Sequence, residues 1–224
     1  ATFHLLDNRQ YRDRHACPPD GTAGPARVRP ERCPELADPA RSMLGARQEA
    51  WLAAGLRTSR ARWNLLAQSV VMTPTNGEAP PAQRYWTDDW SGYPAARQRL
   101  LERLAAERIA GPVVLSGDIH GFMAGELRTG SDAPAPVATE FVTTSLSAQG
   151  TDERLFAAYL ANSPGLRFAT GRSRGYLRLD LEPGALRADM VAMDTVAEPR
   201  AGSRVLASFT VESGRPGLAD GSAG

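Results

Sequence analysis

A carboxylate and an imidazole stand two residues apart at the end of one apolar run in this sequence. Val113-Val114-Leu115-Ser116 leads directly into Gly117-Asp118-Ile119-His120-Gly121. A β-branched run without charge predicts a strand covered on both faces, and ligand groups in α/β proteins gather where such strands end. Asp118 offers a hard oxygen and His120 a borderline nitrogen, a pair that suits Zn, Fe, Mn or, on the oxygen side, Ca. The spacing indicates a hydrolytic metal site.

The two glycines that flank this pair are expected to shape the loop. Gly117 and Gly121 let the backbone turn sharply and leave room for an ion or a phosphate. A purely structural alternative exists for the same residues, with Asp118 capping a turn and His120 acting as a hydrogen-bonded loop histidine. The motif by itself leaves both interpretations open.

Composition bounds the class of protein. The chain has 224 residues, a hydrophobic content of 42% and a formal net charge of +1, which is enough apolar material to fill a core. The near-zero net charge argues against a broad nucleic-acid-binding surface. No apolar run is long enough to span a bilayer, and no charged-then-apolar leader opens the chain.

All 26 basic residues are arginines. The planar guanidinium grips carboxylates and phosphates in a bidentate way, so some of them are expected beside acids or phosphate. A general coding bias accounts for most of the others.

Two cysteines, Cys17 and Cys33, flank a segment rich in Pro, Gly and Arg. A disulfide that pins this loop, at about 13–42, is expected in an oxidising compartment, where closing such a loop stabilises by about 3 kcal/mol in the chain-entropy model. Two free thiols are the alternative. Metal binding by this pair is disfavoured, because the spacing fits no zinc pattern.

Hydrophobic periodicity divides the chain into a mixed first part and an alternating last third. The apolar positions predict strands at 2–6, 63–72, 113–116 and 138–144, and helices over about 44–56, from Pro94, and from Thr151. The first helix is expected to carry Trp51 on its apolar face. Period-two alternation at 175–181, 188–191 and 205–211 marks antiparallel strands with one wet face. The fold class is therefore α/β, ending in an antiparallel β region, with a disordered tail over 215–224.

Six short motifs then occur in one order along the chain. They are Asp7–Arg12, Met43-Leu44-Gly45 with Gln48 and Trp51-Leu52, Trp90-X-Gly92-Tyr93 with Arg97, Leu115–His120, Thr139–Val142 with Thr144-Ser145, and Arg174-Gly175-Tyr176. Together they resemble the PhoD-like alkaline phosphatases of the calcineurin-like metallophosphoesterase superfamily. The resemblance covers residues 1–214, as the C-terminal portion of one metallophosphatase domain.

The resemblance implies a two-sheet sandwich flanked by helices and hydrolysis of phosphate monoesters or diesters. It implies Fe3+ and Ca2+ as cofactors, with Zn or Mn possible, and export to the periplasm or medium. His120 resembles the family's iron-binding histidine, Asp118 a calcium-binding aspartate, and Asp88, preferred over Asp89, a further metal ligand. Arg9 is a candidate for binding the phosphoester substrate.

Two departures from the family pattern stand out. Ser91 replaces the usual Asp, and the family's earlier ligands would lie before Ala1. Two-metal hydrolysis needs more ligands than the described candidates, even with Asn76. The expectation is half of a dinuclear site, catalytic through His120 and Asp118, with the missing N-terminal half of the domain as its partner and the isolated chain inactive.

Several alternatives accompany this hypothesis. Arg9 and Arg12 could instead pair with Asp7 or Asp13, and Glu140 could either orient His120 or pair with a buried arginine. His4 and His15 are expected to be structural or surface groups. Serine catalysis through Ser116 or Ser145 lacks a nucleophile elbow. The main competing class is an extracellular calcium-binding or adhesion module, which would bind calcium through oxygen ligands alone.

Overall fold

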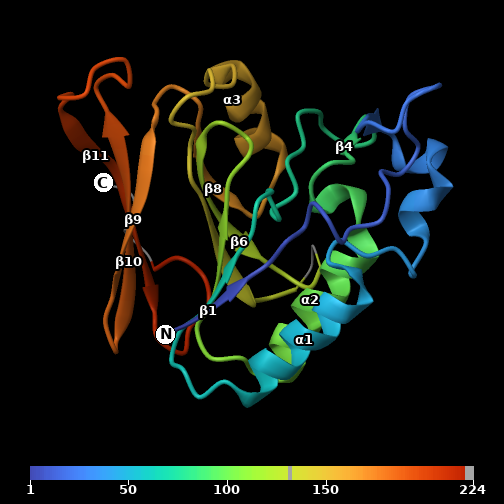
Figure 1. The fold of residues 1–224 in the computed structure, drawn as a ribbon, viewed down its shortest axis with the longest axis horizontal. Helices are drawn as coiled ribbons and strands as arrows, with labels where there is room; N and C mark the ends of the chain where they lie inside the picture. Colours follow the sequence, from blue (N-terminus) through green and yellow to red (C-terminus); the bar gives the residue numbers. More distant parts are fainter. Residues whose placement is uncertain (131–132, 220–224) are drawn as a thin grey trace.

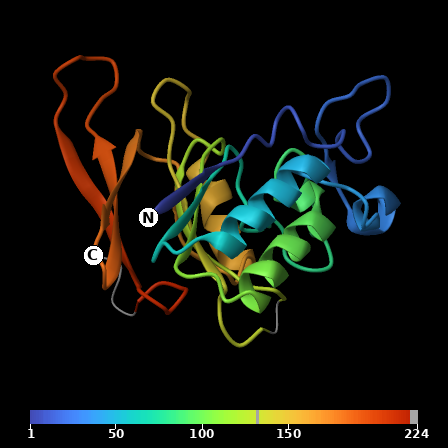
Figure 2. The same ribbon diagram turned by 60° about the horizontal axis from the view of Figure 1, so that its bottom comes forward.

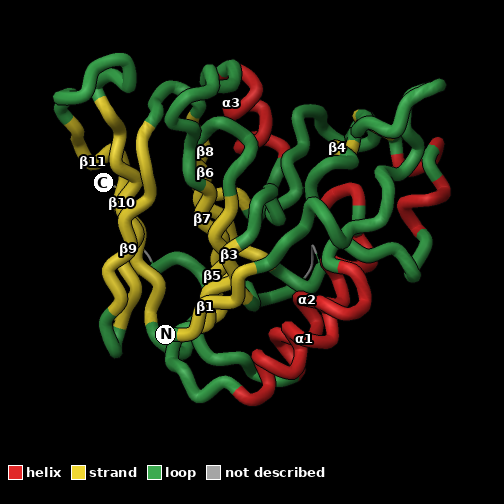
Figure 3. The backbone as a smooth tube through the Cα atoms, viewed as in Figure 1, coloured by secondary structure: helices red, strands yellow, loops and turns green. Residues whose placement is uncertain are grey.

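The computed structural model describes residues 1–130 and 133–219, and two β-sheets form its centre (Figures 1 and 3). The larger sheet has six strands in the order β1-β3-β5-β7-β6-β8. The strands are β1 (Thr2–Leu5), β3 (Asn64–Ala67), β5 (Pro112–Ser116), β7 (Ala138–Val142), β6 (Phe122–Leu127) and β8 (Leu166–Thr170). The first four run parallel, and β6 is antiparallel to both of its neighbours.

The second sheet is an antiparallel meander that packs against one face of the first. Its strands are β9 (Gly175–Leu181), β10 (Ala185–Met193) and β11 (Ser203–Glu212), with β10 in the centre. Inward-facing residues such as Leu186, Ala188 and Met190 form one core with Phe122 and Phe141 of the larger sheet. The predicted α/β fold, a two-sheet sandwich flanked by helices and ending in an antiparallel region, is confirmed.

Helices cover the other face of the larger sheet. The helices α1 (Gly45–Thr58) and α2 (Pro94–Ala106) lie side by side on that face (Figure 2). Their apolar residues, including Leu52, Leu56 and Leu101, share a core with Leu66 and Val114. The third helix, α3 (Glu153–Asn162), packs Phe156 and Tyr159 against the β6–β8 end. Among the described residues, no helix combines the length and apolar character that a membrane crossing requires.

A small lobe is formed by residues 6–44, between β1 and α1, together with the later segment that contains β4. It contains the two-stranded pair β2 (Arg27–Val28) and β4 (Tyr85–Trp86) and the short 3-10 helices η1 (Pro30–Arg32) and η2 (Pro34–Ala37). A third 3-10 helix, η3 (Trp90–Gly92), leads into α2. A disulfide joins Cys17 to Cys33, so the predicted disulfide is confirmed over the alternative of two free thiols.

Four sequence-based expectations need correction. The strand expected over 63–72 ends at Ala67, because the backbone N–H groups of Met72 and Thr73 donate to the Glu140 carboxylate instead of to a strand. The apolar residues after Ala67 are nevertheless buried, although they form no strand. Their burial explains why the sequence pattern resembled a longer strand. Trp51 is 53% exposed, not on the buried face of α1.

The third correction is a strand that the sequence pattern did not reveal. β6 lies between the strands predicted at 113–116 and 138–144, where no strand was predicted, and its buried Glu126 interrupts the apolar run. Arg128 and Arg167 pair with Glu126 and make its burial tolerable. β8 was missed for a similar reason, since Arg167 lies inside it.

The fourth correction concerns the expected tail over 215–224. Gly217 donates its N–H to Thr139, Leu218 packs in the inter-sheet core, and Ala219 donates to the Thr210 carbonyl. Residues 215–219 are therefore part of the fold. Residues 220–224 lie outside the described residues.

Candidate functional site

The loop that follows β5 presents Asp118 and His120 in left-handed backbone conformations. Their φ angles are +73° and +58°, a region that non-glycine residues seldom adopt. Gly117 and Gly121 do not have positive φ, so the expectation that the glycines make the turn is wrong. Gly121 is needed for space, because a Cβ there would lie 2.2 Å from the Phe156 ring. Backbone conformations of this kind concentrate at functional sites.

Neighbouring loops hold the Asp118–His120 segment in place. The Thr151 hydroxyl donates to the Ile119 carbonyl at 2.7 Å, and Ile119 N–H donates to the Gly117 carbonyl at 3.0 Å. At the strand end, Thr143 N–H donates to the Ser116 carbonyl. Both site side chains are exposed while their backbone is tied down, which is the arrangement that a ligand-binding loop requires.

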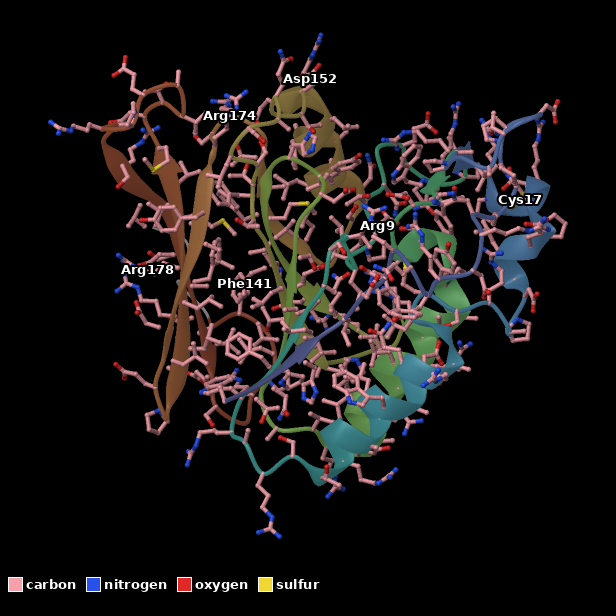
Figure 4. The ribbon with its side chains drawn as sticks, viewed as in Figure 1. Arg9, Cys17, Phe141, Asp152, Arg174 and Arg178 are labelled. Atoms are coloured by element: carbon pink, nitrogen blue, oxygen red, sulfur yellow. A yellow bond between two sulfur atoms is a disulfide. The ribbon has the colours of Figure 1, made fainter. Side chains whose placement is uncertain are left out.

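One arginine bridges two of the predicted metal ligands. Arg9 Nη1 donates to Asp88 Oδ2 at 2.7 Å, and Arg9 Nη2 donates to Asp118 Oδ1 at 2.8 Å. Figure 4 labels Arg9 between the strand ends of the larger sheet and the small lobe. The expectation that Arg9 would pair with Asp7 or Asp13 is wrong, because the chain folds Arg9 onto residues 79 and 109 positions away.

Asp88 is the most heavily charged point of the site. Besides Arg9 it accepts from Arg12 Nη2 at 2.8 Å and from His15 Nε2 at 2.9 Å. Burial alone would raise the pKa of the Asp88 carboxyl, but hydrogen bonds from Arg9 and His15 and the charge of Arg12 outweigh it and lower that pKa. We call Arg9, Arg12, His15, Asp88 and Asp118 the rim cluster.

The neighbouring Asp89 has the opposite character. It is 5% exposed and accepts a hydrogen bond from Ser91 N–H at 2.7 Å as the N-cap of η3. Burial raises the pKa of Asp89 to about 7, with smaller contributions from Glu140 and Asp88 and opposition from the Ser91 hydrogen bonds. Two adjacent aspartates thus differ in charge state near neutral pH, and this difference has no counterpart in the sequence.

A cavity of about 170 Å³ opens beside the rim cluster. Asp89, Asp118 and His120 line it together with Arg27, Trp86 and Tyr159. The Arg27 guanidinium lies over the Trp86 ring at 5.6 Å and donates to the Tyr159 hydroxyl at 3.3 Å. The sequence offered no signal for Arg27 or Tyr159, because 132 positions separate them.

Glu140 of β7 is buried close enough to this region for its charge to act on Asp89. It is fully buried and accepts from Met72 N–H at 2.7 Å, Thr73 N–H at 2.6 Å and the Ser116 hydroxyl. Burial lowers the pKa of the Arg97 guanidinium, and the charge of Glu140 offsets only part of that lowering. The hydrogen bonds of Glu140 hold the segment after β3 and the end of β5, so it does not orient His120 directly.

The remaining predicted residues are dispersed. Asn76 is buried, and its backbone N–H donates a hydrogen bond to the Ser163 hydroxyl oxygen. His4 is buried against Asn64, whereas His15, expected to be peripheral, contacts Asp88. Within residues 1–130 and 133–219, no three His, Cys, Asp or Glu side chains converge as a metal-binding group. These residues alone do not fit a complete metal centre.

Comparison with known proteins places this geometry in a family. The profile of the family described as PhoD-like phosphatase matches residues 1–190. Alkaline phosphatase D from Bacillus subtilis (strain 168) is 34% identical over 223 residues, which cover 97% of this chain and 37% of that protein. A solved structure titled "Structure of PhoD" superposes with a TM-score of 0.84 at 31% identity, covering 99% of this chain and 42% of that one.

The chain therefore spans about two fifths of the length of the relatives it matches. The family profile covers most of the chain, and the structural superposition extends through both sheets. The predicted resemblance is confirmed: this chain belongs to the PhoD-like phosphatase family.

Proposed function

We propose that this chain is the C-terminal portion of a metal-dependent phosphoester hydrolase and supplies half of its dinuclear site. The observation that carries the proposal is the pair Asp118 and His120, both in left-handed conformations at the end of β5 and beside one cavity. The name of the Bacillus subtilis relative supports phosphatase chemistry. The substrates are phosphate monoesters or diesters.

Asp118, His120 and Asp88 are the residues we propose as metal ligands. A mixed carboxylate and imidazole set suits Fe3+ with Ca2+, and Zn or Mn are compatible with the same donors. Metal ions in such sites stabilise charge on a phosphoryl group. Because three such donors do not converge within the described residues, the missing ligands belong to the rest of the polypeptide.

Arg9 is proposed to bind the phosphoryl group. Its side chain is 39% exposed and already positions two N–H donors toward oxygen anions on both sides. A guanidinium in this arrangement can exchange a carboxylate for a phosphate with the same bidentate geometry. The disulfide between Cys17 and Cys33 supports a secreted or periplasmic location, since oxidising compartments preserve such bonds.

The test compares this chain alone with the same chain joined to the segment that precedes Ala1 in the intact polypeptide. Phosphatase activity, phosphodiesterase activity and metal content are measured for both. Activity is expected only in the longer polypeptide. His120→Ala and Asp118→Asn should each lower it by more than about 100-fold.

Asp194→Asn provides the matched control. Asp194 is an exposed carboxylate paired with one arginine, Arg204, just as Asp118 is paired with Arg9. This variant should keep full activity. Calcium binding through oxygen alone, with no hydrolysis in either form, would instead support the adhesion-module alternative. Full activity in the short chain would refute the half-site.

A further inference from the structure

Gln68 directly follows β3, and its side-chain amide contacts three separate segments of the chain. Its Oε1 accepts hydrogen bonds from Asn8 Nδ2 at 2.5 Å, Val70 N–H at 3.1 Å and Trp90 Nε1 at 3.2 Å. Its Nε2 donates to the Ser116 hydroxyl at 2.5 Å and to the Val70 carbonyl. The amide thus uses its oxygen and both of its N–H donors.

In each of these segments, the residue that contacts Gln68 lies one or two positions from a charged residue of the rim cluster. These pairs are Asn8 with Arg9, Trp90 with Asp88, and Ser116 with Asp118. Arg9 in turn joins the carboxylates of Asp88 and Asp118 at 2.7 and 2.8 Å. One amide therefore connects the three segments whose relative placement sets these distances.

The partners of this amide are themselves held in place. Asn8 is fully buried, and its Oδ1 accepts from Ser69 N–H at 3.2 Å and from the Ser69 hydroxyl at 2.7 Å. Trp90 and Ser116 are also buried, and the Ser116 hydroxyl donates to the Glu140 carboxylate. In such a connected set, the loss of one member leaves buried polar groups without partners. A change at the central amide is therefore expected to reach all three segments.

The other end of β3 carries a second side-chain amide that serves as an internal comparison. Asn64 Oδ1 lies 3.3 Å from His4 Nε2 of β1, and Asn64 Nδ2 donates to the Ala110 carbonyl, just before β5, at 2.8 Å. Asn64 lies at the beginnings of the parallel strands β1, β3 and β5, whereas the rim cluster lies beyond their ends. The two amides share a strand and a bonding pattern, but Gln68 is the one beside the site.

We propose that Gln68 is a positioning residue of the candidate site, which fixes the placement of Arg9, Asp88 and Asp118 relative to one another. An uncharged amide suits this role, because it supplies donors and an acceptor without adding charge beside the cluster. An aliphatic or carboxylate side chain supplies only part of this set. The catalytic consequence rests on the proposed function, whereas the geometric consequence applies to this chain by itself.

NMR spectra of this chain alone test the geometric consequence. Gln68→Met keeps an unbranched side chain of similar size and removes the hydrogen bonds of the amide, so the backbone signals of Arg9, Asp88 and Asp118 should all shift. Asn64→Leu is the matched control and should leave these three signals in place, although it removes an amide of the same strand. Unchanged signals in Gln68→Met, or equal shifts in both variants, would overturn the inference.

Steady-state kinetics of the longer polypeptide test the catalytic consequence. Small displacements of groups that orient a substrate lower the rate, so Gln68→Met should reduce kcat at least about 10-fold per folded molecule. Circular dichroism supplies the folded fraction, and Asn64→Leu should keep kcat within about twofold. A residue that only stabilised the fold would change the folded fraction and leave kcat per folded molecule unchanged. That result would refute the positioning role.

A milder variant keeps the test decisive if Gln68→Met does not fold. Asn8→Ala removes the hydrogen bond between the amide and the segment of Arg9, so the Arg9 signals should shift and kcat should fall. Unchanged Arg9 signals in folded Asn8→Ala would contradict the inference. If the unsubstituted longer polypeptide hydrolyses no phosphoester, the proposed function is refuted, and the NMR comparison alone decides the role of Gln68.

Discussion

Asp88 and Asp189 are two aspartates that accept hydrogen bonds from partners of almost the same type: two arginines and one further polar side chain. Asp88 accepts from Arg9, Arg12 and His15, and Asp189 accepts from Arg178, Arg187 and Ser208. The pKa of each carboxyl is lowered because those hydrogen bonds and charges outweigh burial, for Asp189 to about 2. Charge alone does not distinguish the two clusters.

Their positions in the fold distinguish them. Asp189 lies mid-strand in β10, directly opposite Arg178 of β9 and Ser208 of β11, on the outer face of the second sheet. Figure 4 labels Arg178 there, away from Arg9. Asp88 lies in a loop, and Arg9 connects it to Asp118 beside a cavity. An arginine-paired acid thus indicates a site only where a strand end and a cavity accompany it.

The largest effect is expected at Glu140, a buried carboxylate near the rim cluster that accepts hydrogen bonds from two backbone N–H groups. Glu140→Ala leaves the N–H groups of Met72 and Thr73 buried without acceptors, which should lower the free energy of unfolding by about 4 kcal/mol. Urea denaturation measures this change. Glu102→Ala, at an exposed position of α2, is the control and should change stability by less than about 0.5 kcal/mol. A loss below about 1 kcal/mol for Glu140→Ala would contradict its role as the acceptor that holds Met72 and Thr73.

The disulfide should stabilise one cluster and not the other. Replacing Cys17 and Cys33 together with Ser opens a loop with a sequence separation of 16 and should lower the free energy of unfolding by about 3 kcal/mol. Arg12 and His15 precede this loop, and their contacts with Asp88 should weaken. The contacts of Asp189 with its partners should be unchanged. Thermal denaturation measures the first effect and NMR chemical shifts the second. Shift changes of equal size at both clusters would argue against this local dependence.

The pKa of Asp89 is raised, whereas that of Asp189 is lowered, so the two carboxyl groups change the stability of the fold with pH in opposite directions. The folded pKa of Asp89, about 7, lies above the unfolded value of 3.8, so its protonated form favours the fold. The resulting stability is complete below about pH 4 and is lost as the pH rises to about 7. Asp89→Asn, which keeps an N-cap acceptor, should remove a pH dependence on the order of 4 kcal/mol over that window. Denaturation midpoints between pH 4 and 8 measure it, and an unchanged pH profile in the variant would contradict the assignment.

The smallest effect on stability should come from removing the negative charge of one aspartate by substitution with asparagine. Asp189→Asn should cost about 1 kcal/mol at neutral pH, since its arginines are half-exposed and screened. The folded pKa lies below the unfolded one, so this contribution is present above about pH 4 and disappears toward pH 2. Asp88→Asn should instead lower metal content and activity of the longer polypeptide. Reduced activity in Asp189→Asn with normal activity in Asp88→Asn would reverse the comparison.

Sequence reasoning was most accurate where burial follows a local period. α1, the start of α2 and the meander of β9 to β11 lie close to the predicted residues, because each of these elements buries one face through regular spacing. β5 was predicted because its uncharged run is buried on both faces. Sequence reasoning failed at β6 and after β3, where Glu126 is buried against Arg128 and Arg167 and Glu140 replaces a strand ladder. Both failures involve a buried acid that has at least one partner from a distant part of the chain.

The sequence by itself determined the family, the α/β architecture, the strand end that carries Asp118 and His120, and the two cysteines available to pair. These follow from local motifs and spacing. Only the tertiary structure decided that Arg9 joins Asp88 to Asp118, that His15 contacts Asp88, and that Asp89 is more deeply buried than Asp88. The physical reason is that hydrogen bonds and burial depend on which segments meet in space, and here those segments are 73 to 109 positions apart.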